Sequence, residues 1–331
     1  MINIITSVPG FKISEENQKK IGEVSPQVNL QDATPWVSEE MAGNKLHQNE
    51  LNAMLRNAEV ILAWELPDDL VKRAPRLKWI QTMHVGVERI VKDKNLVESP
   101  IKLTNTSGIQ AKAISEYVVT LMLAFDKRLQ AFSELKQQKS WKRITMVGLA
   151  SQTVGILGLG NVGKEVAKIA KALGMHVIAY DRPRKLMRAR YVDQLVSGDD
   201  IDQIFIKSDF VVSCLPLSPN TAGIISEKEL RLMLPNAYLI NVSRGKIVDE
   251  DILITALKEK WIAGAGLDVF STEPLPVESP LWDLPNVIYS AHSSGRLDNR
   301  DDQAVELFIM NLKRYIEGRR LLNIVDKKAG F

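Results

Sequence analysis

The sequence predicts an α/β fold with two doubly wound parallel sheets. Apolar runs of strand length alternate with helical patterns along most of the chain, and this alternation is typical of βα units in a parallel sheet. A glycine-rich turn at 158–163 follows one apolar run directly and opens a helix, as the first turn of a doubly wound sheet does. A final helical stretch follows the last expected strand, so we expect it to return to the first sheet.

The first domain is predicted over residues 1–104 together with 299–331. Its expected strands lie at 2–8, 28–30, 60–64, 77–84 and 101–106. Its helices open near Ser14, span 47–57 and 67–73, follow Gly86, and end the domain at about 299–317. This alternation indicates an open, flavodoxin-like sheet. We expect the chain to pass between domains near 104–110 and 293–300.

The second domain is predicted over residues 105–298. Its expected strands lie at 153–158, 176–181, 210–216, 237–243, 263–269 and 287–291. They fit a Rossmann sheet, whose ligand crevice lies at the carboxyl ends of the strands, and we expect a cleft between the two domains. Ser226 and Glu229 form a capping box that opens one helix. A long helix is expected at 111–138, and its broad apolar stripe serves either packing on this sheet or a subunit contact.

The composition is typical of a globular protein. The 331 residues are 45% hydrophobic, enough for two domains with their own cores. Forty-three basic and 40 acidic residues leave a formal charge of +3, so we expect no nucleic-acid partner. The N-terminus lacks a signal-peptide pattern and no apolar stretch reaches about 18 residues, which predicts a cytoplasmic protein with no membrane partner. The single cysteine, Cys214, lies in an apolar run and is expected in the core.

Residues 153–163 read TVGILGLGNVG and place Gly158, Gly160 and Gly163 on the turn, with Asn161 and Val162 at the helix start. Glycines permit the tight turn, the close approach of a pyrophosphate to the backbone, and tight packing of the helix on the strand. The N–H groups of that helix start would face an anion. For the motif alone, a glycine-rich turn without a ligand is the alternative.

Asp181 ends the next strand, 18 residues after Gly163, where a carboxylate accepts hydrogen bonds from the ribose of a dinucleotide. The turn and Asp181 together predict a dinucleotide site. Because a carboxylate repels a 2′-phosphate, Asp181 favours NAD. NADP is the alternative, since Arg182, Arg184 and Lys185 follow at once and could bind that phosphate. No metal is expected.

Three polar side chains follow expected strands of the second sheet: Arg244 in INVSRG, Glu273 in DVFSTEP and His292 in YSAHSS. Taken singly, each is explained by solvent exposure or a structural hydrogen bond. At successive strand ends of one sheet, however, they provide an anion-binding guanidinium and a carboxylate–imidazole pair.

An ordered series of segments resembles the D-isomer-specific 2-hydroxyacid dehydrogenase family over nearly the whole chain. The segments are MHVGVER (83–89), LTNTSGIQAKAISEY (103–117), GILGLGNVG, LPLSPNT (215–221), NVSRGKIVDEDILITAL (241–257), AGLDVFSTEPLP (265–276) and the turn at His292. Within the family, AWELP (63–67) and EPLPVESPLW (273–282) are most similar to bacterial glyoxylate/hydroxypyruvate reductases.

The resemblance implies an enzyme that transfers hydride from a nicotinamide to the carbonyl carbon of a small 2-oxoacid and yields the D-2-hydroxy acid. His292 would be the acid–base group, Glu273 would orient its ring, and Arg244 would hold the substrate. The first domain would be the substrate domain, and the backbone N–H groups of Val85 and Gly86 would bind the substrate carboxylate.

Further positions match the family. Trp64 and Trp282 resemble residues that line a small pocket, with core packing as the alternative. The resemblance also assigns cofactor contacts to a second group of residues, among which Asp268 has a structural hydrogen bond as its alternative role. These residues are Arg182, Pro216, Thr221, Val242 and Asp268.

The chain also departs from the family pattern. Most members have proline before the histidine, where this chain has Ala291, and Ser293-Ser294-Gly295-Arg296 replaces the small apolar residues that usually follow it. His84 stands where a small or hydroxyl residue is common. We expect it to be an exposed turn residue, with substrate contact as the alternative.

Two other functions fit the same sequence. An NAD(H)-sensing binding protein or co-regulator would have the same fold and the same three polar residues. Phosphoglycerate or another 2-hydroxy acid is an alternative substrate, although the 84–89 turn adds no basic residue beyond Arg89. The family and the 111–138 stretch together suggest a homodimer.

Overall fold

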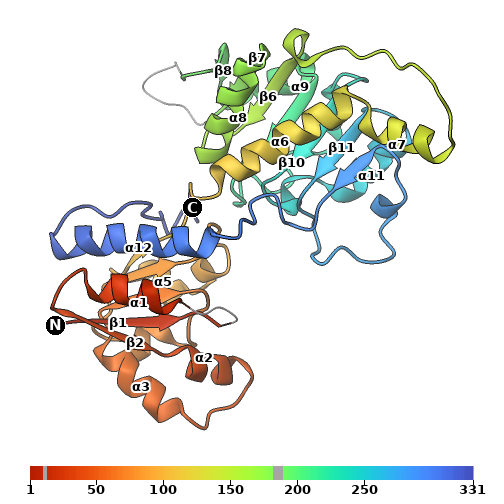
Figure 1. The fold of residues 1–331 in the computed structure, drawn as a ribbon. Coiled ribbons are helices and arrows are strands. Elements are labelled where there is room, and N and C mark those ends of the chain that lie inside the picture. The colour runs from red at the N-terminus through yellow and green to blue at the C-terminus, as the bar shows by residue number, and fades with distance from the viewer. Residues whose placement is uncertain (10–12, 182–188, 331) are drawn as a thin grey trace. The chain divides into compact units, whose positions relative to one another are not determined.

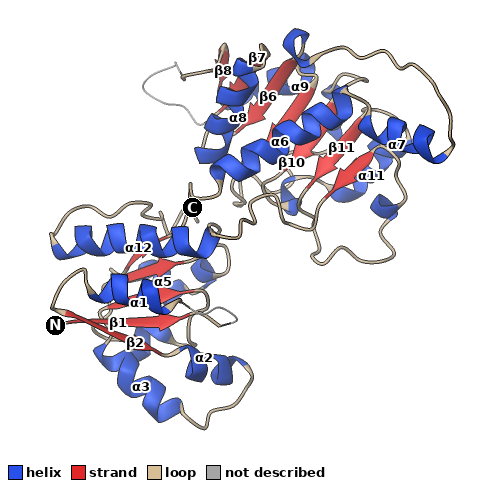
Figure 2. Ribbon diagram, in the orientation of Figure 1, coloured by secondary structure: helices blue, strands red, loops and turns tan. Residues whose placement is uncertain are grey.

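The chain folds into two compact units, each built on a parallel sheet flanked by helices (Figures 1 and 2). The structure is a computed structural model that describes residues 1–9, 13–181 and 189–330. Unit 1 comprises Met1–Ile109 and Asp298–Phe331, and unit 2 comprises Gln110–Leu297. Two α/β units, each with one parallel sheet, confirm the predicted fold class.

Unit 1 has the strand order β2-β1-β3-β4-β5, which is the flavodoxin-like order. The strands are β1 (Ile2–Ser7), β2 (Val28–Asp32), β3 (Val60–Ala63), β4 (Trp79–Thr82) and β5 (Lys102–Thr104). The helices are α1 (Glu15–Gly22), α2 (Thr34–Met41), α3 (Gln48–Asn57), α4 (Leu70–Arg73), α5 (Lys94–Glu98) and α12 (Arg300–Ile316), with a 3-10 turn η1 (Ile90–Lys92). Ser14 caps α1 by accepting a hydrogen bond from the Asn17 N–H. Helix α2 was not expected from the sequence.

The final helix, α12, returns to unit 1 as the sequence predicts. Its apolar stripe packs on one face of the sheet, where the Phe308 ring stacks on Trp79 with 5.2 Å between ring centroids. Helix α3 contributes Leu51 and Leu55 to a second core that also contains Ile61 of β3. Burial on both faces explains why the central strand β3, with the sequence VILA, is apolar throughout rather than alternating.

Unit 2 has the strand order β12-β11-β10-β9-β6-β7-β8, all parallel. The strands are β6 (Thr153–Leu157), β7 (His176–Tyr180), β8 (Gln194–Val196), β9 (Phe210–Ser213), β10 (Tyr238–Asn241), β11 (Gly264–Leu267) and β12 (Val287–Tyr289). The chain order reverses between β6 and β9, which is the switch point where doubly wound sheets bind ligands. The sequence predicted six of these strands and missed β8.

Helices cover both faces of the unit 2 sheet (Figure 2). They are α6 (Ala111–Asp126), α7 (Leu129–Gln137), α8 (Asn161–Ala172), α9 (Asp202–Lys207), α10 (Glu227–Leu232) and α11 (Glu250–Lys258). Short 3-10 turns add η2 (Leu149–Ser151), η3 (Gly198–Ile201), η4 (Gly245–Ile247) and η5 (Pro280–Trp282). The predicted capping box at Ser226 and Glu229 is present at the start of α10.

The prediction of one long helix over 111–138 is wrong. The stretch forms α6 and α7, separated at Arg128, whose φ of 54° is left-handed. Val118, Leu121 and Met122 of α6 belong to the core beneath the sheet, so packing on the sheet accounts for the α6 stripe. Within the ranges that the structure describes, no helix is both long and apolar enough to cross a membrane.

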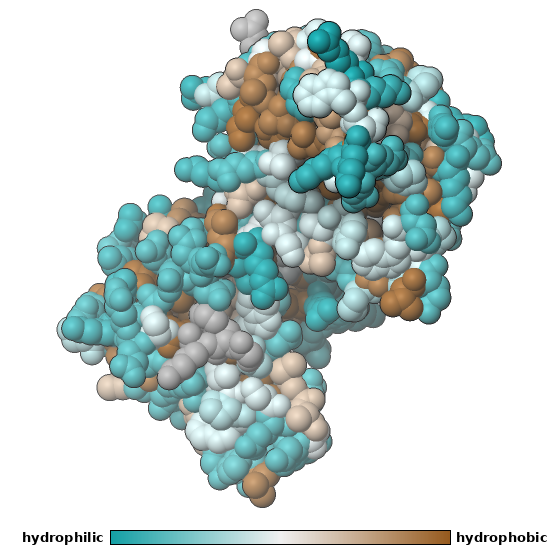
Figure 3. Space-filling view, turned by 45° about the vertical axis from the view of Figure 1, so that its right-hand side comes forward, coloured by the Kyte–Doolittle hydropathy of each residue, from teal (hydrophilic) through white to brown (hydrophobic). Residues whose placement is uncertain are grey.

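Beyond α7, residues 138–147 form an extended segment before η2 (Figure 1). We call residues 127–147 the arm. Its base is fixed, because the Gly148 N–H donates to Asp126 Oδ1 at 2.8 Å and Arg128 Nη1 donates to Tyr238 Oη at 2.8 Å. The face in Figure 3 is mainly hydrophilic, with separate hydrophobic patches.

Candidate active site

The glycine turn after β6 has the geometry that its sequence predicts. Gly158 has a φ of +96°, in the region that favours glycine. A Cβ at Gly163 would lie 2.0 Å from the Gly158 carbonyl oxygen, so α8 can approach the turn only with glycine there. At Gly160 an added Cβ would meet only open space. The turn is therefore tight on the sheet side and open on the side of Gly160.

Helix α8 begins at Asn161, directly after this turn, and continues through Val162 and Gly163. Gly160 occupies the N-cap and has no side chain to cap the helix. The first backbone N–H groups of a helix carry partial positive charge. The geometry therefore fits the phosphate groups of a dinucleotide.

Asp181 follows β7, and its N–H donates to the Val196 carbonyl oxygen of β8 at 3.2 Å. This contact places Asp181 at the end of β7, which pairs with β6, the strand that leads into the glycine turn. The three basic residues that bear on the choice of cofactor, Arg182, Arg184 and Lys185, lie outside the described residues.

The turns after β9 and β10 contribute other predicted cofactor positions. Thr221 Oγ1 donates to the Pro216 carbonyl oxygen at 2.6 Å and closes the turn after β9. Val242 follows β10 and is 8% exposed. Burial raises the pKa of the Cys214 thiol to about 12, so this cysteine is not a nucleophile near neutral pH.

Arg244 follows β10 on a loop that packs closely against a neighbouring loop. A Cβ at Gly245 would lie 1.9 Å from the carbonyl carbon of Phe270, so this approach requires glycine. Asn241 Nδ2 donates to the Arg244 carbonyl oxygen at 3.0 Å, and Arg244 Nη1 donates to the Ser243 carbonyl oxygen at 2.8 Å. The guanidinium is therefore anchored to the loop that follows β10.

Glu273 and His292 form the carboxylate–imidazole pair that the sequence indicates. His292 Nδ1 lies 2.8 Å from Glu273 Oε2, and Glu273 Oε1 accepts the Phe270 N–H at 3.0 Å. Since a carboxylate accepts hydrogen bonds, Nδ1 is the donor in this pair and Nε2 is left to exchange a proton. The two side chains are 51% and 38% exposed, so this nitrogen has access to a substrate.

Trp282 is 42% exposed in unit 2. Its Nε1 donates to the Pro276 carbonyl oxygen at 2.8 Å, and its ring meets Tyr289 edge-on with 4.8 Å between centroids. The exposed fraction rules out full core packing, which was one of its two expected roles.

In unit 1, the predicted substrate residues follow β3 and β4. Trp64 lies 4.1 Å from the His84 ring, centroid to centroid, and its carbonyl oxygen is 2.9 Å from His84 Nε2. Asn105 Nδ2 fixes the next residue by donating to the Val85 carbonyl oxygen at 2.7 Å. Among the residues that the structure describes, the N–H groups of Val85 and Gly86 make no hydrogen bond. They are therefore available to an anion.

The structure corrects the expectation for His84 and adds a residue that the sequence did not indicate. His84 is half-buried rather than exposed, and burial lowers its pKa. Arg300, at the start of α12, places its guanidinium 4.5 Å above the Trp64 ring and donates to the Met83 carbonyl oxygen at 3.2 Å. It is 236 positions from Trp64 in the sequence, so only the return of α12 reveals the contact.

Comparison with known proteins shows the family to which the chain belongs. Residues 119–294 match the family described as D-isomer specific 2-hydroxyacid dehydrogenase, NAD binding domain. A glyoxylate reductase of Thermococcus litoralis is 37% identical over 273 residues, which cover 78% of this chain and 80% of that protein. A D-3-phosphoglycerate dehydrogenase of Methanocaldococcus jannaschii is 32% identical over 88% of this chain and 56% of its own length.

A solved structure matches the fold over the whole length of this chain. The NADPH-dependent glyoxylate/hydroxypyruvate reductase of Sinorhizobium meliloti, in complex with NADP and sulfate, has a TM-score of 0.82 and 26% identity, with 100% of both chains covered. The sequence matches and this likeness agree with the parallel sheets and with the glycine turn of the unit 2 sheet. The chain therefore belongs to the D-isomer-specific 2-hydroxyacid dehydrogenase family and is an NAD(P)-dependent oxidoreductase.

Proposed function

We propose that the protein reduces a small 2-oxoacid of the glyoxylate or hydroxypyruvate kind to the D-2-hydroxy acid. The observation that carries the proposal is the His292–Glu273 pair, joined at 2.8 Å. Arg244 lies on a neighbouring strand end of the same sheet, and the glycine turn follows another strand of it. An acid–base group, an anion-binding group and a dinucleotide turn are what a hydride transfer to a 2-oxoacid requires.

His292 would protonate the carbonyl oxygen through Nε2 and would take the proton back in oxidation. Glu273 would keep the ring in the orientation that leaves Nε2 toward the substrate. The planar guanidinium of Arg244 would bind the carbonyl and carboxylate oxygens, because its fork matches two acceptors at once. When bound, the nicotinamide supplies the hydride.

The cofactor would lie along the carboxyl edge of the unit 2 sheet, over the glycine turn. Gly158–Gly163 would hold its phosphates and Asp181 its adenosine ribose. Pro216, Thr221 and Val242 would contact the remainder, whereas the buried Asp268 has the structural hydrogen bonds that were its alternative role. We assign NAD on the strength of the Asp181 carboxylate, which would repel a 2′-phosphate, and NADP is the alternative.

Unit 1 would bind the substrate carboxylate through the N–H groups of Val85 and Gly86. The proposal is supported by the absence of a hydrogen bond from either N–H group among the described residues and by Asn105, which binds the Val85 carbonyl oxygen of the same turn. Trp64 and the partly exposed Trp282 would limit the size of the substrate. Two indoles of this size favour compact acids over branched or aromatic ones.

The test is oxidation of NADH and of NADPH in the presence of a panel of 2-oxoacids, among them glyoxylate, hydroxypyruvate, phosphohydroxypyruvate and a branched acid. We expect the highest kcat/KM with glyoxylate or hydroxypyruvate and with NADH. His292→Ala should lower kcat by roughly 10²–10⁴-fold, as loss of a general acid does. His176→Ala is the matched control, because His176 is a 53% exposed histidine paired with Asp193.

Each result has one interpretation. Preference for NADPH would contradict the role of Asp181, and preference for the phosphorylated acid would replace the substrate class. Tight dinucleotide binding without turnover of any acid would support the alternative of a nucleotide-sensing protein. Turnover that survives His292→Ala would contradict the mechanism.

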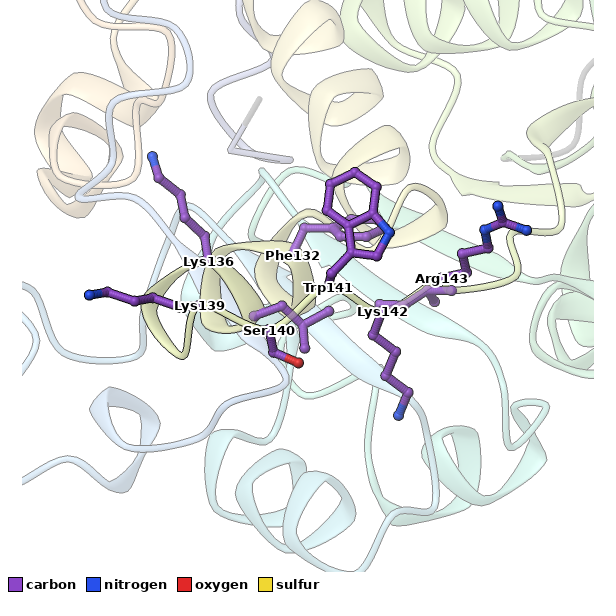
Figure 4. A pocket seen from close by; sticks show the side chains of 9 residues that line it. Phe132, Lys136, Lys139, Ser140, Trp141, Lys142 and Arg143 are labelled. Carbon is purple, nitrogen blue, oxygen red and sulfur yellow. The ribbon is translucent and has the colours of Figure 1, made fainter.

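We also propose that the protein is a homodimer joined through the arm. The support is an exposed apolar surface on a fixed base. Trp141 is 97% exposed and lines, with Phe132 and Lys136, a hollow of about 690 Å³ (Figure 4). The lysine side chains in Figure 4 point in different directions. The apolar side chains that line the hollow are those of Phe132, Leu135, Trp141 and Ile144.

A further inference from the structure

The loop after β12 holds His292 in a conformation that needs support. His292 has a φ of 50°, a left-handed value that non-glycine residues seldom adopt and that costs energy. The residue before it is Ala291, and alanine does not restrict the backbone as proline would. Some other interaction must therefore keep the loop in this shape.

Asp268, directly after β11, supplies that interaction. Asp268 is buried, with an exposed fraction of 1%. Among the described contacts, its carboxylate accepts hydrogen bonds only from residues of this loop. Ser290 Oγ donates to Oδ1 at 2.6 Å, the N–H groups of Ser293 and Ser294 donate to Oδ1 at 2.7 and 3.0 Å, and Ser294 Oγ donates to Oδ2. The Asp268 carbonyl oxygen also accepts the His292 N–H at 2.8 Å.

The arrangement makes the loop shape and the buried charge depend on each other. A buried carboxylate is costly unless donors surround it, and hydrogen bonds to a charged group are stronger than those between neutral groups. If the loop moved, Asp268 would lose several donors at once. Two of the four donors are hydroxyl groups, of Ser290 and Ser294, so this contribution depends on serine at these positions.

We infer that Ser290 and Ser294 are positioning residues for His292. By donating to Asp268 from both sides of His292, they hold the left-handed backbone there. The imidazole thereby keeps its 2.8 Å contact with Glu273. The inference rests on the proposed function in one respect, because positioning affects turnover only if His292 is the acid–base group.

The experiment compares Ser290→Ala, Ser294→Ala and the double variant with Ser293→Ala. Ser293 is the matched control, since its side chain donates to the Ala291 carbonyl oxygen at 2.9 Å and it binds Asp268 only through its backbone. We expect kcat to fall roughly tenfold in each single variant and roughly 10²-fold in the double variant, because small displacements of a reacting group have effects of that size. KM should change less than kcat, Ser293→Ala should keep the parent kcat, and Ser294→Thr should restore most of the activity lost in Ser294→Ala.

A second readout does not depend on turnover. The chain has four histidines, so the ring nitrogen signals in NMR spectra can be assigned with single His variants. The His292 signals should show a hydrogen-bonded Nδ1 in the parent and in Ser293→Ala, and should move toward those of a free imidazole in the double variant. Parent-like kcat and ring signals in the double variant would overturn the inference, and the single variants decide the question if the double variant does not fold. If the parent reduces no 2-oxoacid, the proposed function fails, while the ring signals still test the positioning.

Discussion

At the scale of single residues, His84 links the stability of unit 1 to pH. Burial lowers its pKa from the ordinary value of 6.5, while Nε2 stays 2.9 Å from the Trp64 carbonyl oxygen. Below pH 6.5 the unfolded chain therefore takes up the proton more readily than the folded chain. Its stabilising contribution is present above that pH and is lost as the pH falls through the folded pKa.

Replacing His84 should remove this dependence. Glutamine keeps a side-chain N–H for the Trp64 carbonyl but does not titrate, so His84→Gln should lose less stability than the parent between about pH 8 and about pH 5. Urea unfolding at several pH values measures the difference. An equal loss in parent and variant would contradict the assignment to His84.

His47 offers a comparison of opposite sign. Its Nδ1 lies 2.7 Å from Glu39 Oε2, and this hydrogen bond raises its pKa. The stabilisation from His47 is therefore complete below pH 6.5 and is lost as the pH rises through the folded pKa. In the same urea unfolding experiment, His47→Gln should consequently lose more stability than the parent between about pH 8 and about pH 5.

The sequence indicated some residues of the candidate site and missed others, for physical reasons. Glu273 and His292 each follow a strand, and strand ends of a parallel sheet meet at one edge, so their contact follows from the pattern. The sequence showed Ser294 only as a departure from the family pattern and gave no signal for Ser290, because their partner Asp268 lies more than twenty positions earlier in the chain. Such contacts become visible only when the register of β11 and β12 is known.

At the scale of secondary-structure elements, a buried polar network attaches α12 to the sheet of unit 1. Asn311 is fully buried and Nδ2 donates to Gln81 Oε1 at 3.1 Å, while its Oδ1 accepts the Leu322 N–H at 2.7 Å. Thr104 Oγ1 donates to the same Gln81 oxygen at 2.8 Å and accepts from Trp79 Nε1 at 2.7 Å. The network therefore joins α12, β4 and β5.

Asn311→Leu should destabilise unit 1 by about 1–3 kcal/mol, the usual cost of leaving buried polar groups without partners. The Leu322 N–H would lose its acceptor and Gln81 one of its donors. The midpoint of urea unfolding measures the effect, with Met310→Leu as control because Met310 is 49% exposed on the same helix. A midpoint equal to that of the parent would show that the network adds nothing to stability.

The elements also show which signals a sequence carries and which it does not. Most strands contain a buried run of apolar residues, such as VILA in β3 and FVVS in β9, and these runs predicted them. Strand β8 has the sequence QLV and only one fully buried residue, so it lacks the apolar run that indicated the other strands. The break between α6 and α7 falls at Lys127-Arg128, where neither glycine nor proline marks the end of a helix.

At the scale of the whole molecule, the arm is the feature that a single chain does not explain. Trp141 and Val147 are 97% and 66% exposed, although apolar side chains of this size gain from burial. The base of the arm is held by the buried Asp126 and by Arg128. Apolar side chains exposed on a segment whose base is held in this way are typical of an interface.

We therefore expect a mass of twice the 37.1 kDa chain in sedimentation at micromolar concentration. Trp141→Ser should weaken self-association by at least about tenfold in Kd, since tryptophan is often dominant in interfaces. Val277→Ser is the control, because Val277 is 85% exposed but lies outside the arm. A monomeric parent would refute the dimer. If Trp141→Ser dimerises as tightly as the parent, the interface does not include Trp141. The apolar stripe of α6 could not form that interface either, because it packs on the sheet.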